Sequence, residues 1–479
     1  MKLSKLLNDI EVLENRLDLQ TEVNNICYDS RKVKKGDLFV AIRGYETDGH
    51  KYIEKALEQG ATCVICEQAE KQVPAIIVKN SRIALAQIGA NQFDNPAKKL
   101  KMIGVTGTNG KTTTTYLIKH ILENTGAKVG LIGTNQNMIG DKVLETERTT
   151  PESYELQKLF SEMVSAGCTH CVMEVSSHSL VLDRVYGVPF EVGAFTNLTQ
   201  DHLDFHKTME EYRKAKTILF TMCEKGVLNM DDSASEKILL DATCPIITYS
   251  AQNESADLFA KNIQLNADCV KFDVSTKDQN ASVNLAIPGQ FTVSNALTAI
   301  GVCYELGISL EQSAKALETA HGVKGRVEVV KTNTDYTVLI DYAHSPDGVE
   351  NVLKAVRGFT KGRVIALFGC GGDRDRTKRP KMGAIAAKLA DYCIVTSDNP
   401  RTEKPELIID DIIEGMKNTD TPYSVIVSRP EAIFYALDMA EKNDTIVLMG
   451  KGHETYQEIN HVKHHMDERE IIADYFAKK

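Results

Sequence analysis

The chain has no long apolar run near its start. Asp9, Glu11 and Glu14 interrupt the leucines there, so this segment fits neither a signal peptide nor a membrane span. We therefore expect a cytoplasmic protein without a membrane partner. The apolar residues repeat instead at the spacing of an amphipathic helix. They are Leu3, Leu6, Leu7, Ile10 and Leu13.

Basic residues are not in excess either. The chain has 56 Lys and Arg against 66 Asp and Glu, a net charge of −10. A general nucleic-acid-binding protein usually carries a basic excess, so we expect no nucleic-acid partner, and phosphate groups must be met by local positive sites. The 479 residues suggest roughly three domains of about 150 residues each. No repeat or low-complexity stretch is present. We expect the protein to be a monomer.

The eleven cysteines are scattered. Without a secretory signal they are expected to be reduced and mostly buried. Two pairs have C-x-x-C spacing, Cys63 with Cys66 and Cys168 with Cys171, both in strand-like runs. A strand points residues i and i+3 to opposite faces, which is poor geometry for a shared metal. We expect no zinc site here.

Changes of pattern divide the chain into three parts. Residues 1–95 alternate short strands and a helix, as in a small α/β unit. Residues 96–325 open with a strand, a glycine-rich turn and a helix, and residues 252–289 read as β-hairpins before a helix near Phe291. Residues 326–479 alternate apolar strands with helices, which predicts a doubly wound, mainly parallel sheet.

The glycine-rich turn predicts a phosphate-binding loop. It comprises Gly107, Thr108, Asn109, Gly110, Lys111, Thr112 and Thr113. Backbone N–H groups of such a turn and the following helix N-terminus hold phosphate oxygens. Lys111 can reach the outer phosphates, and the Thr112 hydroxyl can reach magnesium. The general P-loop pattern needs glycine where this chain has Val105, so the match is to a shorter G-x-x-G-K-T.

Two later segments offer metal ligands. Glu174 ends an apolar strand in MEVSSH, where P-loop enzymes place a magnesium ligand. A buried glutamate or a core histidine would explain that segment equally well. Residues 201–206 then bring together two Asp and two His, among them His202. Since magnesium requires hard ligands beside the phosphates, a site is the better interpretation of the second segment.

Together these segments resemble the Mur ligase family of ATP-dependent peptide-bond-forming enzymes in peptidoglycan synthesis. The shared motifs are GVTGTNGKTT, MEVSSH, TNLTQDHLDFH, GRVE, DYAHSPD and FGCGGDRDRTKRP, in the same order along nearly the whole chain. The resemblance implies an α/β fold of three domains. These are a small N-terminal α/β UDP-binding domain, a central P-loop ATPase-type parallel sheet and a C-terminal Rossmann-like doubly wound sheet.

The resemblance also implies roles for single residues. Lys111 and Thr112 match ATP and Mg²⁺ contacts, and Glu174 and His202 match magnesium ligands. Lys216 matches a lysine that is carbamylated and so serves a second magnesium; Lys111, Lys216 and His202 form the implied catalytic group. Further nucleotide contacts are Asn295, Arg326 and Asp341. Implied contacts to UDP-MurNAc-L-Ala-D-Glu are Ser30, Thr149, Thr150, Ser176 and Arg184. One departure is Leu182, where the Gram-negative enzymes have glutamine.

Four C-terminal strands each run into a polar cluster. Because ligands bind beyond the carboxyl ends of strands in open α/β sheets, the clusters are expected at one edge. The candidate amino-acid contacts are Arg374, Asp398, Asn399, Pro400, Arg401, Gly450 and Glu454. Arg374 and Arg401 can pair with a carboxylate, and Glu454 can hold an ammonium group. An arginine at position 401 suits the extra carboxylate of meso-diaminopimelate, and the lysine-adding relatives tend to lack it.

The implied reaction has two steps. ATP phosphorylates the D-glutamyl carboxylate of UDP-MurNAc-L-Ala-D-Glu, and the amine of meso-diaminopimelate then attacks the acyl phosphate. One alternative is a ligase of the same family that adds lysine to this precursor or glutamate to folate. Another is a P-loop kinase or a regulator without ligase chemistry. The Ser30 segment argues against this second alternative, because a kinase has no use for a UDP-binding module.

Overall fold

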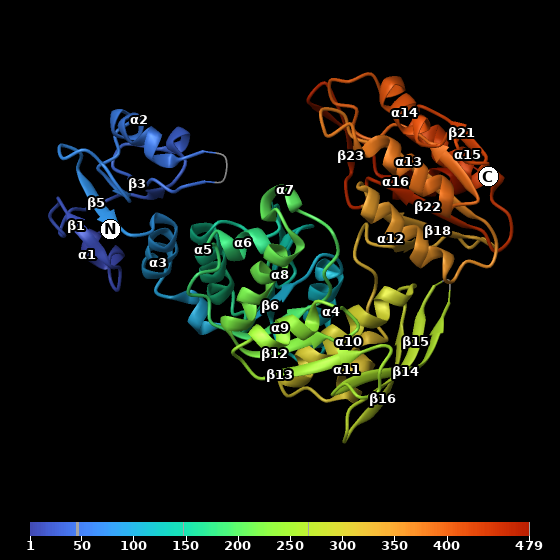
Figure 1. Cartoon of the computed structure of the whole chain (residues 1–479), viewed down its shortest axis with the longest axis horizontal. Helices are drawn as coiled ribbons and strands as arrows, with labels where there is room; N and C mark the ends of the chain where they lie inside the picture. Colours follow the sequence, from blue (N-terminus) through green and yellow to red (C-terminus); the bar gives the residue numbers. More distant parts are fainter. Residues whose placement is uncertain (45–46, 147, 267, 479) are drawn as a thin grey trace. The chain divides into compact units, whose positions relative to one another are not determined.

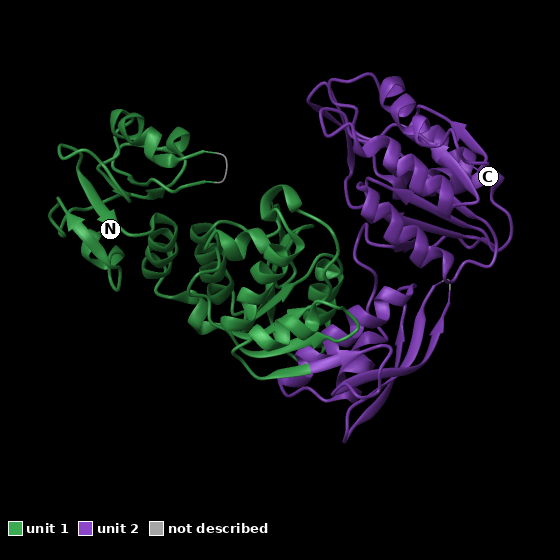
Figure 2. Cartoon of the chain, in the orientation of Figure 1, with its two compact units in different colours: residues 1–247 green, residues 248–479 purple. Residues whose placement is uncertain are grey.

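Two compact units make up the chain, residues 1–247 and 248–479 (Figure 2). The computed structural model describes residues 1–44, 47–146, 148–266 and 268–478. The expected α/β fold is confirmed, with a sheet for each of the three expected domains. The domain boundaries near residues 95 and 325 stay predictions, since the first unit combines the first sheet with most of the second. None of the helices in the described ranges is both long and apolar enough to cross a membrane.

The first sheet has the strand order β1-β5-β4-β3-β2. Its strands are β1 Val12–Asn15, β2 Ile26–Cys27, β3 Leu38–Val40, β4 Cys63–Cys66 and β5 Ala75–Val78. Its helical segments are α1 Leu3–Leu6, η1 Ser30–Lys32, η2 Gly49–Tyr52, α2 Ile53–Glu58, α3 Ser81–Gln92 and η3 Pro96–Lys99. Helices α1 and α3 pack on one face and α2 on the other, and Cys63 and Cys66 lie in these two separate cores.

The prediction that the first amphipathic helix extends to Leu13 is wrong. Helix α1 ends at Leu6, and Asp9 has a left-handed backbone with φ of 56°. The chain then enters β1, which pairs with β5, and Leu13 is exposed. Pairing with a strand distant in sequence therefore overrides the local pattern.

The second sheet begins in the first unit. Strands β12 Cys223–Asn229, β11 Phe190–Phe195, β6 Lys101–Thr106, β10 His170–Glu174 and β7 Val129–Ile132 run parallel in that order, followed by β8 Asn137–Ile139 and β9 Lys142–Leu144. The helices are α4 Lys111–Asn124, α5 Ser153–Ser165, α6 Ser177–Val181, α7 Leu203–His206, α8 Met209–Thr217, η4 Ile218–Thr221 and α9 Ser235–Asp241. The parallel arrangement places the carboxyl ends of β6 and β10 side by side.

The chain passes into the second unit within β13 Ile246–Ser250. There β14 Leu258–Leu265 pairs with β13, and β15 Val270–Ser275 and β16 Asn280–Leu285 follow in antiparallel order. Helices α10 Gln290–Glu305 and α11 Leu310–Leu317 come next. The expected hairpins and the helix near Phe291 are therefore confirmed.

The last sheet has the order β17-β18-β22-β19-β20-β21. Its strands are β17 Glu328–Val330, β18 Thr337–Asp341, β19 Val364–Phe368, β20 Tyr392–Val395, β21 Tyr423–Val425 and β22 Thr445–Met449. Helices α12 Pro346–Arg357, α13 Lys378–Leu389 and α14 Pro405–Glu414 cover one face, and α15 Arg429–Met439 and α16 Glu468–Ala477 cover the other (Figure 1). The hairpin of β23 Tyr456–Ile459 and β24 Val462–His465 lies outside the sheet.

This arrangement is the doubly wound sheet that the sequence predicts. Strands β18, β22, β19 and β20 are parallel neighbours, so the polar clusters that follow them share one edge. All eleven cysteines are free thiols. No group of three or more His, Cys, Asp or Glu side chains in the described ranges is arranged to hold a metal ion.

Candidate active site

The phosphate-binding loop follows β6 and ends at the start of α4. Gly107 and Gly110 have φ of 146° and 83°, values that side chains rarely adopt. A Cβ on Gly107 would lie 1.9 Å from the Thr196 hydroxyl. The Lys111 ammonium folds over the loop and donates to the carbonyls of Gly107 (3.1 Å) and Thr108 (2.8 Å). The loop is therefore closed around a cation at the first turn of the helix.

Residues 196–199 brace this loop. Thr196 donates its hydroxyl to the Asn109 carbonyl at 2.7 Å, and the Asn197 side chain accepts the Asn109 amide at 2.9 Å. The Thr108 amide donates to the Asn197 carbonyl. The segment that we singled out for its Asp and His residues thus begins by fixing the shape of the phosphate loop.

Glu174 lies at the end of β10 beside Thr112. The Thr112 hydroxyl donates to Glu174 Oε1 at 2.9 Å, and Glu174 is 1% exposed. Thr134 donates its amide and its hydroxyl to the same carboxylate, each at 2.9 Å. A Cβ on Gly133 would lie 2.5 Å from Glu174 Oε1. The two predicted magnesium contacts are thus together, and Thr134 is a partner that the sequence reasoning missed.

Lys216 is buried against the same loop. Its Nζ donates to the Gly107 carbonyl at 2.7 Å and lies 4.3 Å from the centre of the Tyr212 ring. Burial, and then the positive charge of Lys111, hold the pKa of Lys216 well below its usual value. Lys214, two residues earlier, is exposed and pairs with Glu211. Of the two lysines, Lys216 faces the phosphate loop.

His202 begins α7 in a left-handed conformation with φ of 52°. Its ring contacts His178 edge-on at 4.9 Å between centroids, and its Nε2 is 3.5 Å from the Asp201 carboxylate. Burial, and secondarily the Lys111 cation, lower the pKa of His202. The neutral imidazole, which is the metal-binding form, is therefore favoured.

The donor set fits magnesium. Thr112 and Glu174 provide hard oxygens at the phosphate loop, and magnesium usually takes only one or two carboxylates and completes its shell with phosphate oxygens and water. A closed cage of protein ligands is not required. The two Asp and two His of residues 201–206 do not form one, since no group of three or more such side chains in the described ranges is arranged to hold a metal.

Four residues predicted to bind the UDP substrate gather around Glu174. The Thr150 hydroxyl donates to the Glu174 carbonyl at 2.8 Å and accepts the Ser176 amide at 3.1 Å. Arg184 donates to the Thr150 carbonyl at 3.1 Å. The Thr149 hydroxyl is 3.0 Å from that of Thr134. This group is thus continuous with the magnesium contacts.

Ser30 lies in the same unit, between strands β2 and β3 of the first sheet. It is buried at the start of η1, where Asp29 caps the turn. Tyr28, two residues earlier, donates its hydroxyl to Glu155 on α5 at 2.5 Å. This bond connects the Ser30 segment to the helix that follows Thr149 and Thr150.

Glu152 is a residue that the sequence reasoning missed. It is 5% exposed and contacts Arg82 at 3.2 Å, Arg148 at 3.1 Å and Arg184 at 2.9 Å. Three guanidinium groups around one carboxylate leave an excess of positive charge, which favours an anionic substrate. Just before α5, Glu152 resembles an ordinary acid at a helix start, so no local pattern indicates this role.

The three predicted nucleotide contacts of the second unit, Asn295, Arg326 and Asp341, differ from one another in their contacts. Asp341 accepts the amides of Val327 and Ala343, both at 2.8 Å, and therefore stabilises a turn in which Val327 has φ of 44°. Arg326 stacks over Tyr342 at 5.2 Å, and its Nε is buried without a hydrogen-bond partner in the described ranges. That donor fits an anionic group. Asn295 is buried on α10.

The candidate amino-acid contacts lie at one edge of the last sheet, as expected. Arg401, with φ of 50°, donates Nε to Glu458 at 3.0 Å and Nη1 to the Gly372 carbonyl at 2.9 Å. A Cβ on Gly371 would lie 2.9 Å from Arg401 Nη1 and 3.9 Å from Arg374 Cγ. The Arg401 guanidinium and the aliphatic part of the Arg374 side chain therefore both lie close to Gly371.

The opposite charge at this edge comes from Glu454. Its Oε2 accepts Asn399 Nδ2 at 2.9 Å and the ammonium of Lys451 at 2.6 Å. Lys451 is fully buried and also donates to Asn399 Oδ1 at 2.8 Å. Lys451, which the sequence reasoning did not propose, thus joins the clusters after β20 and β22. Pro400 separates Asn399 from Arg401 in the first of them.

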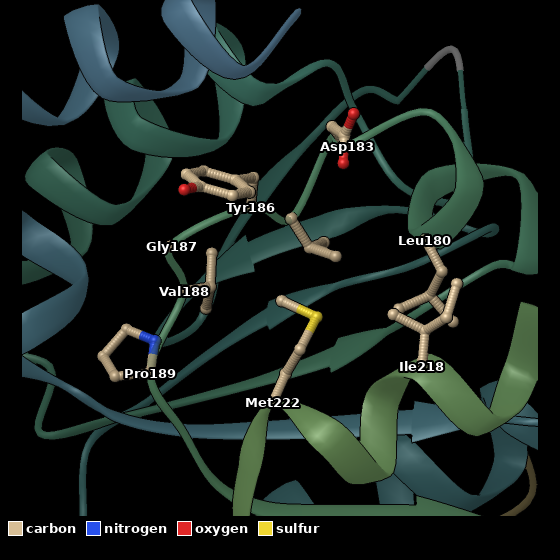
Figure 3. Close-up of a pocket in the computed structure, with 9 residues that line it drawn as sticks. Leu180, Asp183, Tyr186, Gly187, Val188, Pro189, Ile218 and Met222 are labelled. Carbon is tan, nitrogen blue, oxygen red and sulfur yellow. The ribbon is translucent and has the colours of Figure 1, made fainter. Parts of the chain in front are cut away.

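An apolar pocket of about 510 Å³ lies beside α6 and η4 (Figure 3). Its lining residues are Leu180, Asp183, Val185, Tyr186, Gly187, Val188, Pro189, Ile218 and Met222. Asp183 supplies the one ionisable carboxylate in this lining, and burial raises its pKa. The lining lacks the cationic groups needed for a diphosphate or a carboxylate, so we do not assign it to the substrate.

Comparisons with known proteins agree with this geometry. The Mur ligase middle domain matches residues 105–303, the Mur ligase glutamate ligase domain matches residues 325–452, and the Mur ligase family catalytic domain matches residues 22–103. The chain is 52% identical over 483 residues to UDP-N-acetylmuramoyl-L-alanyl-D-glutamate--2,6-diaminopimelate ligase 1 of Clostridium acetobutylicum, covering 100% of both chains.

Two further relatives carry the same enzyme name. That of Clostridium botulinum is 50% identical over 485 residues, covering 99% of each chain. A solved structure of UDP-N-acetylmuramoyl-L-alanyl-D-glutamate--2,6-diaminopimelate ligase has a TM-score of 0.73 at 30% identity, covering 100% of this chain and 99% of its own.

Proposed function

The chain belongs to the Mur ligase family, and we propose that it joins meso-diaminopimelate to the D-glutamyl carboxylate of UDP-MurNAc-L-Ala-D-Glu at the expense of ATP. The observation that carries the choice of amino acid is the Arg401 guanidinium beside Gly371 and Gly372, in the loop that also carries Arg374. An amino acid with a second carboxylate offers these cations a further anionic partner, which lysine does not. The relatives named for this reaction support the same choice.

The first unit carries out the phosphoryl transfer. Lys111 and the amides of the phosphate loop bind the triphosphate and stabilise charge that develops on the transferred group. Thr112, Glu174, His202 and a carbamate on Lys216 would hold magnesium. The metal would supply further charge neutralisation. The excess positive charge around Glu152 attracts the anionic UDP substrate, and Ser30, Thr149, Thr150, Ser176 and Arg184 contact it.

The environment of Lys216 supports the proposed carbamylation. Only the neutral amine adds CO₂, in a reaction that forms an N–C bond and releases one proton. Burial and Lys111 lower the pKa of Lys216, so its environment favours the neutral amine. The carbamate exchanges a buried cation for an anionic oxygen ligand, which suits a second magnesium.

The second unit binds the amino acid. Arg401 and Arg374 pair with its distal carboxylate, Glu454 holds an ammonium group, and Asp398, Asn399, Pro400 and Gly450 shape the site. Asn295, Arg326 and Asp341 serve the nucleotide, Asp341 by supporting the turn that carries Arg326. The reacting amine loses a proton and attacks the acyl phosphate, which forms the amide and releases phosphate. Exclusion of water protects the acyl phosphate from hydrolysis.

The test is phosphate release from ATP with UDP-MurNAc-L-Ala-D-Glu and each candidate amine. We expect turnover with meso-diaminopimelate and little with lysine. Rapid turnover with lysine would identify a lysine-adding ligase, and turnover with a folate and glutamate would identify a folate ligase. ATP turnover, measured as ADP formation, that is independent of any amine would support a kinase or a regulator. We also propose a monomer located in the cytoplasm, which sedimentation and cell fractionation would test.

A further inference from the structure

Two polar loops of the second unit leave strands that are not neighbours. Residues 397–401 follow β20 and residues 450–454 follow β22, and β19 lies between these strands. The proposed amino-acid contacts Asn399 and Glu454 belong to one loop each and share a hydrogen bond of 2.9 Å. The site therefore depends on the spacing of the two loops.

Arg429 contacts the chain at the base of both loops. It is the first residue of α15, and its side chain is 0% exposed. Its Nη1 donates to the Ser397 carbonyl at 3.4 Å, and its Nη2 donates to the Met449 carbonyl at 2.9 Å. Ser397 directly precedes Asp398, and Met449 directly precedes Gly450. One guanidinium group thus joins the main chain where the two loops begin.

Glu468 orients this guanidinium. It is the first residue of α16, is 0% exposed, and accepts Arg429 Nε at 2.8 Å. A buried ion pair gives little net stability compared with apolar residues of similar size, because the desolvation of both charges offsets their attraction. Apolar residues would not replace the rigid, planar set of N–H donors of the guanidinium. Here these donors hold two carbonyls at a fixed separation.

The contact between Asp398 and Gly450 is an independent sign that the spacing matters. Asp398 Oδ1 accepts the Asn399 amide at 2.7 Å, whereas its buried Oδ2 has no hydrogen-bond partner in the described ranges. A Cβ on Gly450 would lie 2.5 Å from that Oδ2. The loops are thus in direct contact beside Asn399, and a small change in their spacing would disturb this contact.

We propose that Arg429 is a positioning residue of the amino-acid site, with Ser397 and Met449 as its contacts and Glu468 as its support. The inference rests on the proposed function, since it takes Asn399 and Glu454 to bind the amino acid. Arg429 acts on the binding of the amine donor and leaves the ATP and UDP-substrate contacts of the first unit unaffected.

The experiment compares the KM of each substrate in wild type, Arg429→Met and the double variant Arg429→Met/Glu468→Met. The double variant leaves no unpaired charge buried, so it keeps the fold. We expect the KM for meso-diaminopimelate to rise about 10- to 100-fold in both variants, as displaced binding groups would cause. The KM values for ATP and for UDP-MurNAc-L-Ala-D-Glu should stay at their wild-type levels.

Arg363→Met is the matched control. Arg363 donates to Asp444 at 2.7 Å and to the Met439 carbonyl at 2.9 Å, and so joins β19 and β22 at their amino ends, at the opposite edge of the same sheet. This variant should lose thermal stability without a change in the KM for meso-diaminopimelate.

The inference is overturned if the Arg429 variants keep the wild-type KM for meso-diaminopimelate, or if Arg363→Met raises it equally. A wild-type enzyme that releases phosphate without an amine would overturn the proposed function and this inference together. Normal wild-type kinetics with an unchanged KM in the double variant would overturn this inference alone.

Discussion

Arg401 and Glu458 form an ion pair, with 3.0 Å between Nε and Oε2. The main chains of the two residues are also joined, because the Arg401 amide donates to the Glu458 carbonyl at 3.1 Å. The guanidinium is thus oriented from two directions before any substrate binds. Such preorganisation lowers the entropic cost of binding a carboxylate.

Arg401→Ala should raise the KM for meso-diaminopimelate about 100-fold, because a bidentate charge-assisted contact is lost. The KM for ATP should stay unchanged, and discrimination against lysine should weaken. Steady-state kinetics with both amino acids would measure this. Arg376→Ala is the control, since Arg376 is exposed and pairs with Asp411 near the same edge. An unchanged KM in Arg401→Ala would contradict the assigned role.

Glu174→Gln should lower kcat by about 100-fold, because the substitution removes a negative magnesium ligand at the phosphate loop. The concentration of Mg²⁺ needed for half-maximal rate should rise. Initial rates over a series of Mg²⁺ concentrations would show the shift. Loss of thermal stability with an unchanged Mg²⁺ requirement would mean that Glu174 only fixes Thr112 and Thr134.

Lys216 should carry one added CO₂ in protein kept under bicarbonate. Mass spectrometry under native conditions would detect the addition, which Lys216→Met should abolish together with most of the activity. Lys214→Met is the control. Lys214 lies on the same helix but is exposed, so this variant should keep both the added CO₂ and the activity. Full activity in CO₂-depleted enzyme whose Lys216 is unmodified would refute the carbamate.

His170 should make the fold sensitive to acid. Burial, with a smaller contribution from Lys101, lowers its pKa from 6.5 to about 4. Between these values the unfolded chain binds a proton that the folded chain does not, so stability falls as pH falls from 6.5 towards 4. His170→Asn should remove about 1 kcal/mol of this loss, allowing for solvent screening.

Thermal unfolding at several pH values would measure the effect of His170. The gap between variant and wild type should change between pH 7 and 4.5 and stay constant above pH 7.5, where the histidine is neutral in both states. Parallel curves across the whole range would show that His170 does not contribute.

Much of the C-terminal half could be predicted from the sequence. Each strand there is a short apolar run that ends in a polar cluster, and parallel strands bring their carboxyl ends to one edge. The position of Arg374, Arg401 and Glu454 at one edge therefore followed from the pattern. The proximity of Thr112 to Glu174 depended on β6 and β10 being neighbours. Strand order in a sheet is not written in local residue patterns, so the family resemblance was needed to assign both residues to magnesium.

Other features could not be read from the chain. Glu152 resembles an ordinary acid at a helix start, and its three arginine partners come from separate segments. Arg429 and Glu468 resemble surface charges at helix starts, yet both are completely buried, because the ends of α15 and α16 meet over the sheet edge. Contacts of this kind arise only from tertiary packing.

The β23–β24 hairpin has an evolutionary consequence. Arg401 forms a parallel bridge with Ile459, and its carbonyl accepts the Asn460 amide, so an exposed ribbon outside the sheet fixes its direction. Insertions or substitutions in that ribbon would redirect the guanidinium while every core strand stayed in register. A lineage could thus acquire a new amino-acid preference without rebuilding the domain.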